Sequence, residues 1–218
     1  DDWSGLIAGL AAREGLTYLR ELPAPVASAV LAAPAAIARW IAARMPQAAA
    51  ARTMSVLIIG AETTDAPDHG RWYQLIPELL DARCEIRVSL IGQELDLGFA
   101  SAAAARAPEV PAQCERATLA EFLGRNRAAS FDLAAVFQPG LQKHRGWLAT
   151  GGFTQLLAAG VSIIGSSYEI DEYEMDRWVL KCYGYRASRE PLLNPFVLEL
   201  GDAATSVRWG RALWQIEA

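Results

Sequence analysis

Polar side chains that could do chemistry follow four short apolar runs of this 218-residue chain. They are Glu62 after the first run, Gln93 and Glu94 after the second, Gln138 after the third, and Ser166, Ser167, Tyr168 and Glu169 after the fourth. If the runs are parallel strands, these residues meet in the crevice at the carboxyl ends of the strands, where such sheets bind ligands. Carboxylates and a tyrosine could act there as acid or base. A carboxylate after the second strand could also hold a ribose hydroxyl.

The apolar run from Val56 to Ile59 is the centre of this pattern. Four apolar residues without polar alternation indicate a strand buried on both faces, which is typical of parallel sheets flanked by helices. A phosphate or methionine group needs glycines after this strand, so that the backbone can approach the ligand. The chain offers Gly60 there, without a G-x-G-x-x-G motif. The sequence therefore favours a crevice that no longer grips a dinucleotide or S-adenosylmethionine, and we expect no cofactor.

Strands and helices alternate from Met54 onward. We expect strands at 54–60, 85–91, 110–115, 131–137, 161–164 and 194–200, with an antiparallel edge within 207–216. We expect helices after the first strand (72–80), from the capping box of Thr118 and Glu121, at 147–159 and at 169–182. This order predicts an α/β fold, a Rossmann-like, doubly wound and mostly parallel sheet with an N-terminal helical extension.

Residues 1–52 are an Ala-rich helical arm, and we place the boundary with the α/β domain, residues 53–218, near Arg52. Pro34 should kink or restart the arm's second helix. The arm could cover one face of the sheet, or residues 1–50 could dock on another protein. Its longest uncharged stretch, 22–38, is interrupted by prolines and falls short of the ~20 apolar residues of a membrane span. We therefore expect no transmembrane segment.

Composition narrows the function classes further. A net charge of −5 and the lack of a Lys/Arg run argue against nucleic acid as a partner. The three cysteines lack C-x-x-C spacing, and His69 and His144 are too few for a metal cluster, so we expect neither a disulfide framework nor a metal site. Glu172 and Asp176 form the one neat carboxylate pair for a metal, but an acidic helix start matched to the helix dipole is the simpler interpretation.

The motifs in chain order resemble the C-terminal domain of mitochondrial splicing suppressor 51-like proteins, which accompanies MYND-type zinc fingers. The resemblance covers roughly residues 54–200. It rests on Gly60-Ala61-Glu62, Arg71-Trp72, Leu75-Ile76-Pro77, Ile91 to Leu95, Phe131-Asp132-Leu133, Gln138 to Leu141, Trp147, Ser166 to Glu169, Asp176 and Asn194-Pro195-Phe196. The family usually has Pro at Gln93 and Asn at Gln138, and the zinc-finger and haem-associated motifs are absent, so neither zinc nor haem carries over.

The resemblance implies a Rossmann-like domain without established catalysis, which works through protein contacts in mitochondrial gene expression or respiratory-complex biogenesis. The start at Asp1 is compatible with a removed targeting segment. Our leading hypothesis is a non-catalytic interaction module, an accessory subunit or assembly factor whose arm docks on partners. It would be mitochondrial, or alternatively cytoplasmic.

The alternative is a small-molecule-dependent enzyme or sensor, for a nucleotide or S-adenosylmethionine, that uses the crevice. The candidate crevice residues are Gly60, Glu62, Gln93, Glu94, Gln138, Gly140, Ser166, Tyr168, Glu169 and Asn194.

Overall fold

The computed structural model describes residues 3–50, 52–143, 145–196, 198–200, 207–209 and 211–218. Within them the strands are β1 (Thr53–Ile59), β2 (Glu85–Ile91), β3 (Gln113–Glu115), β4 (Leu133–Val136), β5 (Ser162–Ser167), β6 (Arg186–Ala187), β7 (Leu192–Leu193), β8 (Leu198–Leu200), β9 (Val207–Trp209) and β10 (Ala212–Glu217). The α-helices are α1 (Trp3–Ala11), α2 (Ala24–Arg44), α3 (Pro46–Ala49), α4 (Ile76–Leu80), α5 (Leu119–Arg125), α6 (Gly146–Ala149), α7 (Gly152–Ala158) and α8 (Ile170–Cys182). The 3₁₀ helices are η1 (Thr17–Glu21), η2 (Pro67–Leu75), η3 (Ala104–Arg106) and η4 (Ala128–Ser130).

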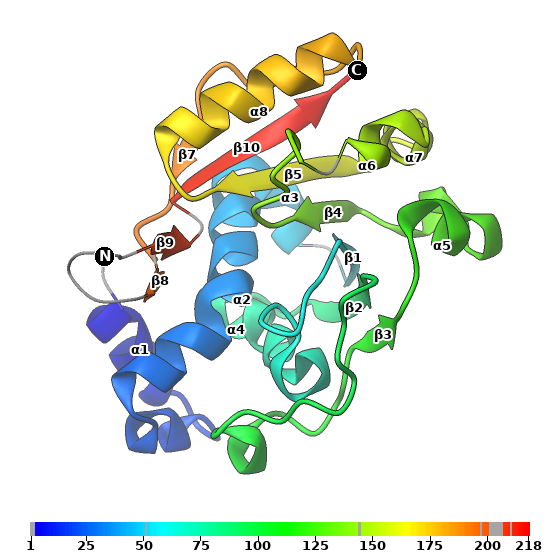
Figure 1. Cartoon of the computed structure of the whole chain (residues 1–218). Coiled ribbons are helices and arrows are strands. Elements are labelled where there is room, and N and C mark those ends of the chain that lie inside the picture. The colour runs from blue at the N-terminus through cyan, green and yellow to red at the C-terminus, as the bar shows by residue number, and fades with distance from the viewer. Residues whose placement is uncertain (1–2, 51, 144, 197, 201–206, 210) are drawn as a thin grey trace.

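The main sheet has the strand order β3-β2-β1-β4-β5-β10-β6, with β7 paired to β10 (Figure 1). β1 pairs in parallel with both β2 and β4, so the chain builds outward through β2 and β3 and then returns to the other side of β1. β5 continues the parallel order beside β4. The predicted doubly wound, mostly parallel α/β sheet is confirmed. Its change of direction lies between β1 and β4, the position where such sheets bind ligands.

The C-terminal region differs from the prediction in two places. The tail predicted within 207–216 as an antiparallel edge does run antiparallel as β10, but it lies inside the sheet, between β5 and β6. The single strand predicted over 194–200 is wrong, because β7 ends before this range and β8 pairs with β9 in a separate two-stranded sheet. Pro195 has no N–H to donate to a strand ladder, and the Phe196 N–H donates instead to the Asn194 side chain at 3.1 Å.

Helix α2 covers one face of the main sheet (Figure 1). Its residues Ile37, Trp40 and Ile41 are almost fully buried, and they share a core cluster with Val56 and Ile58 of β1. Val56 and Ile58 are two residues apart, so both point to the same side of the strand. The Ala-rich arm is therefore part of the protein's own core.

The segment before α2 is also packed against the α/β domain. Leu10 and Leu19 are buried in a second cluster that includes Trp72 of η2. Arg13 forms an ion pair with Glu78 of α4, with 2.9 Å between Nη1 and Oε2. The structure gives no support to the prediction that residues 1–50 dock on a partner, because the buried apolar side chains of this arm pack inside the molecule.

Helix α2 is long and apolar enough to cross a membrane by length and composition alone, but 72% of its most apolar window is buried inside the protein. That burial is typical of a core helix. Pro34 lies inside this helix and does not restart it. Since proline has no N–H, the carbonyl of Val30 lacks the i→i+4 bond made elsewhere, and burial of the surrounding face holds the helix together.

The other face of the sheet is covered by α5, α7 and α8. Leu57 and Ile59 of β1 point to this side and join a core cluster with Phe122, Phe153 and Val179, one from each helix. The β1 side chains thus alternate between two apolar layers, as the unbroken apolar run predicts.

Two predicted helices differ in the structure. The helix predicted over 147–159 is divided into α6 and α7 by Gly151, which has a φ of 72°. The helix predicted over 72–80 is a 3₁₀ helix up to Leu75, where η2 ends, and an α-helix from Ile76, where α4 begins. Three consecutive residues with positive φ, Asp68, His69 and Gly70, precede the predicted range, and left-handed backbone cannot continue a right-handed helix.

Gly165→Ala should lower the free energy of unfolding by about 1–3 kcal/mol, because it overpacks the contact between β5 and β10. A methyl group on Gly165 would lie 2.3 Å from Cη2 of Trp214, whose side chain is fully buried. The matched control is Gly124→Ala on α5, where no atom lies within 4 Å of the added carbon and stability should rise by up to ~1 kcal/mol. Urea denaturation of both variants measures the difference, and equal losses would contradict this account.

Candidate functional site

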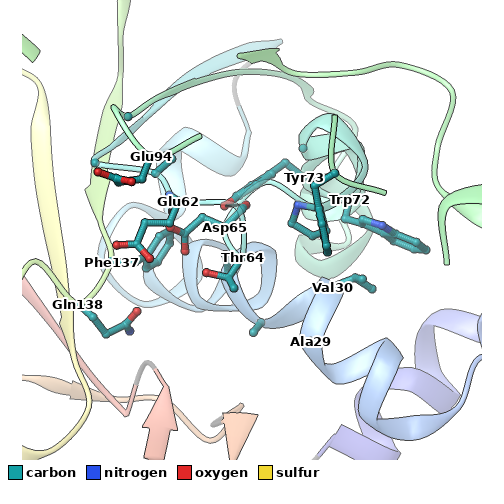
Figure 2. Close-up of a pocket in the computed structure, with 18 of the residues that line it drawn as sticks. Ala29, Val30, Glu62, Thr64, Asp65, Trp72, Tyr73, Glu94, Phe137 and Gln138 are labelled. Atoms are coloured by element: carbon teal, nitrogen blue, oxygen red, sulfur yellow. Dashed lines mark hydrogen bonds between the residues drawn. The ribbon is translucent and has the colours of Figure 1, made fainter. Parts of the chain in front are cut away.

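A cavity of about 1030 Å³ lies at the carboxyl ends of the central strands. It is lined by residues that follow β1, β2 and β4, and α2 closes its far side (Figure 2). The cavity therefore occupies the point between β1 and β4 where the strand order changes direction, which is the expected ligand position in this architecture.

Six of the ten sequence-predicted residues line this cavity. They are Gly60, Glu62, Gln93, Glu94, Gln138 and Tyr168. They come from four loops that are distant in sequence, and the parallel strands bring those loops together. Burial raises the pKa of the Tyr168 hydroxyl, so this group stays protonated at neutral pH and can donate a hydrogen bond.

Ser166 lies behind the cavity wall and orients Gln138. The fully buried Ser166 Oγ accepts hydrogen bonds from the Gln138 backbone N–H at 3.1 Å and from its Nε2 at 2.7 Å. Gln138 has a φ of 38°, a conformation that costs energy in a residue with a side chain. The two hydrogen bonds hold the Gln138 amide at the cavity despite that cost.

The other three predicted residues lie outside the cavity lining. Glu169 pairs with Arg211, with 2.5 Å between Oε2 and Nη1. Asn194 is buried and bonds locally to Phe196. Gly140, with a φ of 47°, shapes the turn after β4. Their roles in the structure are an ion pair, local hydrogen bonding and a turn.

Three carboxyl groups gather on one side of the cavity: Glu62, Asp65 and Glu94 (Figure 2). Asp65 is 8% exposed, and its Oδ2 accepts the Glu62 backbone N–H at 2.8 Å. Burial, together with the nearby Glu62 charge, raises the pKa of Asp65 to about 7, against the lowering effect of this hydrogen bond. We call these three residues the acidic side. No lysine or arginine lies among the described residues that line the cavity.

Asp65 is a site residue that the sequence reasoning missed. Its signal was its position three residues after Glu62, within a polar loop that follows a buried strand. A side chain at that spacing can accept a backbone N–H and close a turn, as Asp65 does here.

Gly60 serves packing rather than ligand approach. It has a φ of 68°, and a Cβ at this position would lie 2.4 Å from the Trp147 ring. The positive-φ residues of η2 follow this loop, so no regular helix N-terminus points at the end of β1. The usual site for a pyrophosphate in such a sheet, a glycine loop running into a helix, is therefore not formed among the described residues.

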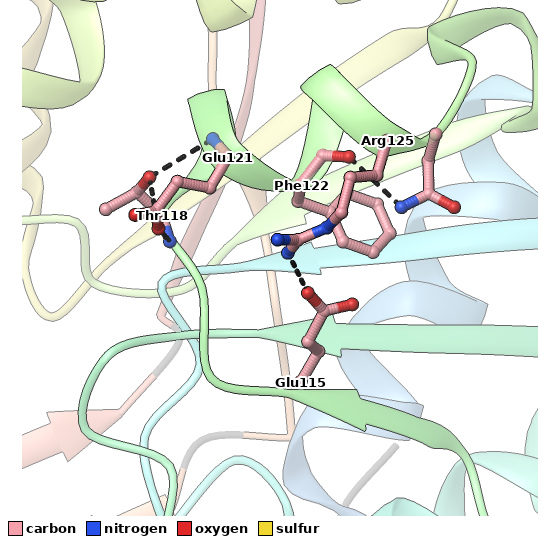
Figure 3. Close-up of polar contacts among 6 residues, drawn as sticks. Glu115, Thr118, Glu121, Phe122 and Arg125 are labelled. Carbon is pink, nitrogen blue, oxygen red and sulfur yellow. Dashed lines mark hydrogen bonds and ion pairs between the residues drawn. The ribbon is translucent and has the colours of Figure 1, made fainter.

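The loop after β3 completes the cavity on the side of α5. The Thr118 side chain accepts the Glu121 N–H at 3.2 Å, while Glu121 Oε2 accepts the Thr118 N–H at 2.8 Å (Figure 3). This is the predicted capping box, and it is confirmed. Arg125 on the same helix pairs with Glu115 at the end of β3. The cap fixes Thr118 and Leu119, which line the cavity.

Among the described residues, no group of three or more His, Cys, Asp and Glu side chains could hold a metal ion. His69 is exposed in a left-handed turn, and His144 lies outside the described residues. The carboxylate pair of α8 accepts backbone hydrogen bonds instead: Glu172 from the Tyr168 N–H at 2.6 Å, and Asp176 from the Leu141 N–H at 3.1 Å.

Comparison with known proteins gives no family for the chain. No family model and no curated protein matches it. Similar solved structures include a protein of Thermoplasma acidophilum described provisionally as a methyltransferase, with 13% identity, a TM-score of 0.45, and coverage of 77% of this chain and 69% of that one. Another is precorrin 8W decarboxylase of Methanobacterium thermoautotrophicum, with 14% identity, a TM-score of 0.42, and coverage of 82% and 88%. Both carry enzyme names, but likeness at this level assigns no activity.

The leading hypothesis of a non-catalytic interaction module is wrong. Its docking device, the arm of residues 1–50, is buried against the molecule's own sheet. The residues after the strands line a large cavity. These findings favour the alternative, a small-molecule-dependent protein that uses the crevice.

Proposed function

We propose that the cavity binds a phosphate-free nucleoside with a positive charge, of the S-adenosylmethionine class, and that the protein is a methyltransferase-like enzyme. The observation that carries this proposal is the charge of the lining. Glu62, Asp65 and Glu94 face the cavity without a basic side chain among the described lining residues. A sulfonium or ammonium group gains from such surroundings.

The same charges disfavour nucleotides that carry phosphate groups. A pyrophosphate needs backbone N–H groups at a helix N-terminus or basic side chains, and the end of β1 supplies neither within the described residues. Carboxylates beside a bound phosphate repel it, which discriminates against NAD and ATP.

Each carboxylate has a role that follows from its position. Glu94 follows β2, the strand after which nucleotide-binding sheets hold the ribose hydroxyls. Glu62 and Asp65 follow β1, next to the centre of the sheet, and would face the positive charge. A sulfonium donor gives its methyl group to a nucleophile and becomes a neutral thioether, so charge at the site falls during the reaction.

A thermal-shift comparison tests the proposal. S-adenosylmethionine at 100 times its dissociation constant should stabilise the protein by ~2.7 kcal/mol, or roughly 5–10 °C for a chain of this size. S-adenosylhomocysteine should also raise the melting temperature, whereas ATP and NAD should leave it unchanged. Glu94→Gln should weaken S-adenosylmethionine binding by about tenfold or more, the usual contribution of a hydrogen bond to a charged group.

The control variant is Glu174→Gln, which removes a carboxylate of α8 that pairs with Arg177 outside the cavity lining. It should bind S-adenosylmethionine like the unmodified protein. Stabilisation by ATP or NAD, or no response to either S-adenosyl compound, would contradict the proposal.

A further inference from the structure

The half of the cavity opposite the acidic side is apolar. It is formed by Val26, Ala29, Val30 and Ala33 of α2 together with Trp72 and Phe99, and we call these six residues the apolar lobe. Figure 2 shows Trp72 and Val30 on the far side of the cavity from Glu62 and Glu94. One cavity therefore joins two chemically different halves.

The polar side-chain atoms of Trp72, Tyr73 and Ser101, around the apolar lobe, form hydrogen bonds within the protein. Trp72 Nε1 donates to Asp68 Oδ2 at 2.7 Å, and the Ser101 hydroxyl donates to the same oxygen at 2.6 Å. Tyr73, also in the lining, donates its hydroxyl to the Asp65 carbonyl at 2.9 Å. The side chains of this half therefore contact a ligand through carbon atoms, so shape and apolar surface would select it.

The cavity is large for a ligand site. Pockets for a single small ligand measure about 300–1000 Å³, and this one, at about 1030 Å³, lies at the upper limit of that range. Ala29 and Ala33 keep the lobe open, because a larger side chain at either position would project into it. The sequence alone could also assign the small residues of the arm to docking on a partner. In the structure, these two alanines line the cavity instead.

The loop that carries Phe99 borders the apolar lobe, and hydrogen bonds from Ser101 to Asp68 hold this loop in place. Besides binding Trp72, Asp68 accepts the Ser101 backbone N–H at 2.8 Å and is itself only 3% exposed. Phe99 is 39% exposed and lines the cavity. An apolar ligand in the lobe would cover part of this ring.

We propose that the apolar lobe binds an uncharged hydrophobic small molecule, which is the methyl acceptor. The assignment as acceptor rests on the proposed function, whereas binding to the lobe does not. In the transfer, the methyl–sulfur bond breaks with its electron pair left on sulfur. A bond forms between the methyl carbon and a nucleophilic atom of the acceptor, whose proton passes to a cavity carboxylate.

N-phenyl-1-naphthylamine, a neutral dye that fluoresces in apolar surroundings, tests the proposal on the full chain. The dye should bind the unmodified protein, and Ala29→Phe should weaken that binding at least tenfold by filling the lobe. Ala43→Phe places the same ring on α2 at an exposed position outside the cavity lining, and it should leave dye binding unchanged. Circular dichroism of both variants confirms that they fold.

S-adenosylmethionine binding separates this proposal from the proposed function. Ala29→Phe should retain it, and Glu94→Gln should weaken it by about tenfold or more while still binding the dye. Dye binding with no response to S-adenosylmethionine would contradict the proposed function and the acceptor role, but it would still support a ligand site in the apolar lobe. No dye binding, or equal loss in Ala29→Phe and Ala43→Phe, would overturn the apolar lobe itself.

Discussion

S-adenosylmethionine is expected to bind up to about a hundredfold more tightly at pH 8 than at pH 5. Burial raises the pKa of Asp65 to about 7, so its carboxyl is ionised above that pH and neutral below it. The ionised fraction falls from about 0.9 at pH 8 to about 0.01 at pH 5. Two unit charges 4 Å apart near a protein surface attract by about 4 kcal/mol, and a hundredfold change in affinity needs only about 2.8 kcal/mol.

Isothermal titration calorimetry at pH 5, 6, 7 and 8 measures this dependence, with S-adenosylhomocysteine as the control ligand. That compound has the same nucleoside and amino acid but no sulfonium charge, so its affinity should fall much less on acidification. Asp65→Asn should make the S-adenosylmethionine profile nearly flat and leave it weak throughout. Equal pH dependence for the two ligands would show that Asp65 does not face the sulfonium.

The fold was largely predictable because each central strand has a local sequence signal. The run of Val56 to Ile59 is apolar at every position, and in the structure successive side chains enter two different core layers. The predicted range 85–91 matches β2. The Thr118 and Glu121 pair predicts the start of α5, because a capping box involves only the first turn of the helix. Such elements can be predicted from the sequence because their signals depend only on neighbouring residues.

The partner of the Ala-rich arm was not predictable from its composition. A helix face of alanines and a few large apolar residues fits equally well on a sheet or on another protein, and only the folded chain shows that Trp40 packs on β1. Likewise, the tail was predicted as an antiparallel edge, but the insertion of β10 beside β5 depends on long-range pairing. The resemblance to the splicing suppressor domain and a mitochondrial location stay predictions.

The site residues that follow regular strands were predictable from the sequence. Those that irregular backbone brings to the cavity were missed. Glu62 and Glu94 follow regular strands, so sheet geometry alone brings them to one edge. Trp72 reaches the cavity because three left-handed residues redirect η2, and Asp65 because it folds back onto the Glu62 N–H. The sequence signals for both conformations are weak, since Gly70 is the one glycine among the three left-handed residues and Asp65 has only its place in a polar loop.

Asp176→Asn should stabilise the protein at pH 8 by at most about 4 kcal/mol and leave its stability nearly unchanged at pH 4. The Asp176 side chain is fully buried, and burial raises its pKa to about 7, with the Glu172 charge adding to the shift. Between the unfolded pKa of 3.8 and about 7, the folded protein holds a proton that the unfolded chain has released. Stability is therefore fully present below this window and is lost as pH rises through it, by about 1.4 kcal/mol per pH unit.

Asparagine keeps the shape of the protonated acid. Its oxygen can accept the Leu141 N–H, and its amide can donate to Ser167 Oγ, the two contacts that Asp176 makes at 3.1 and 3.4 Å. Asp176→Ala should instead be destabilising at pH 4, and less stable than Asp176→Asn at pH 8, by about 1–3 kcal/mol in each case, since it leaves the Leu141 N–H without this acceptor.

Urea denaturation at pH 4, 6 and 8 measures these differences. Asp65 titrates in the same direction, but it is present in both proteins, so the difference between Asp176→Asn and the unmodified chain isolates Asp176. The matched control is Asp171→Asn, an exposed first-turn residue of the same helix, whose loss should cost only about 0.3–1 kcal/mol at pH 6 and 8 alike. If Asp176→Asn changed stability by the same amount at all three pH values, the buried acid would not be the group that titrates.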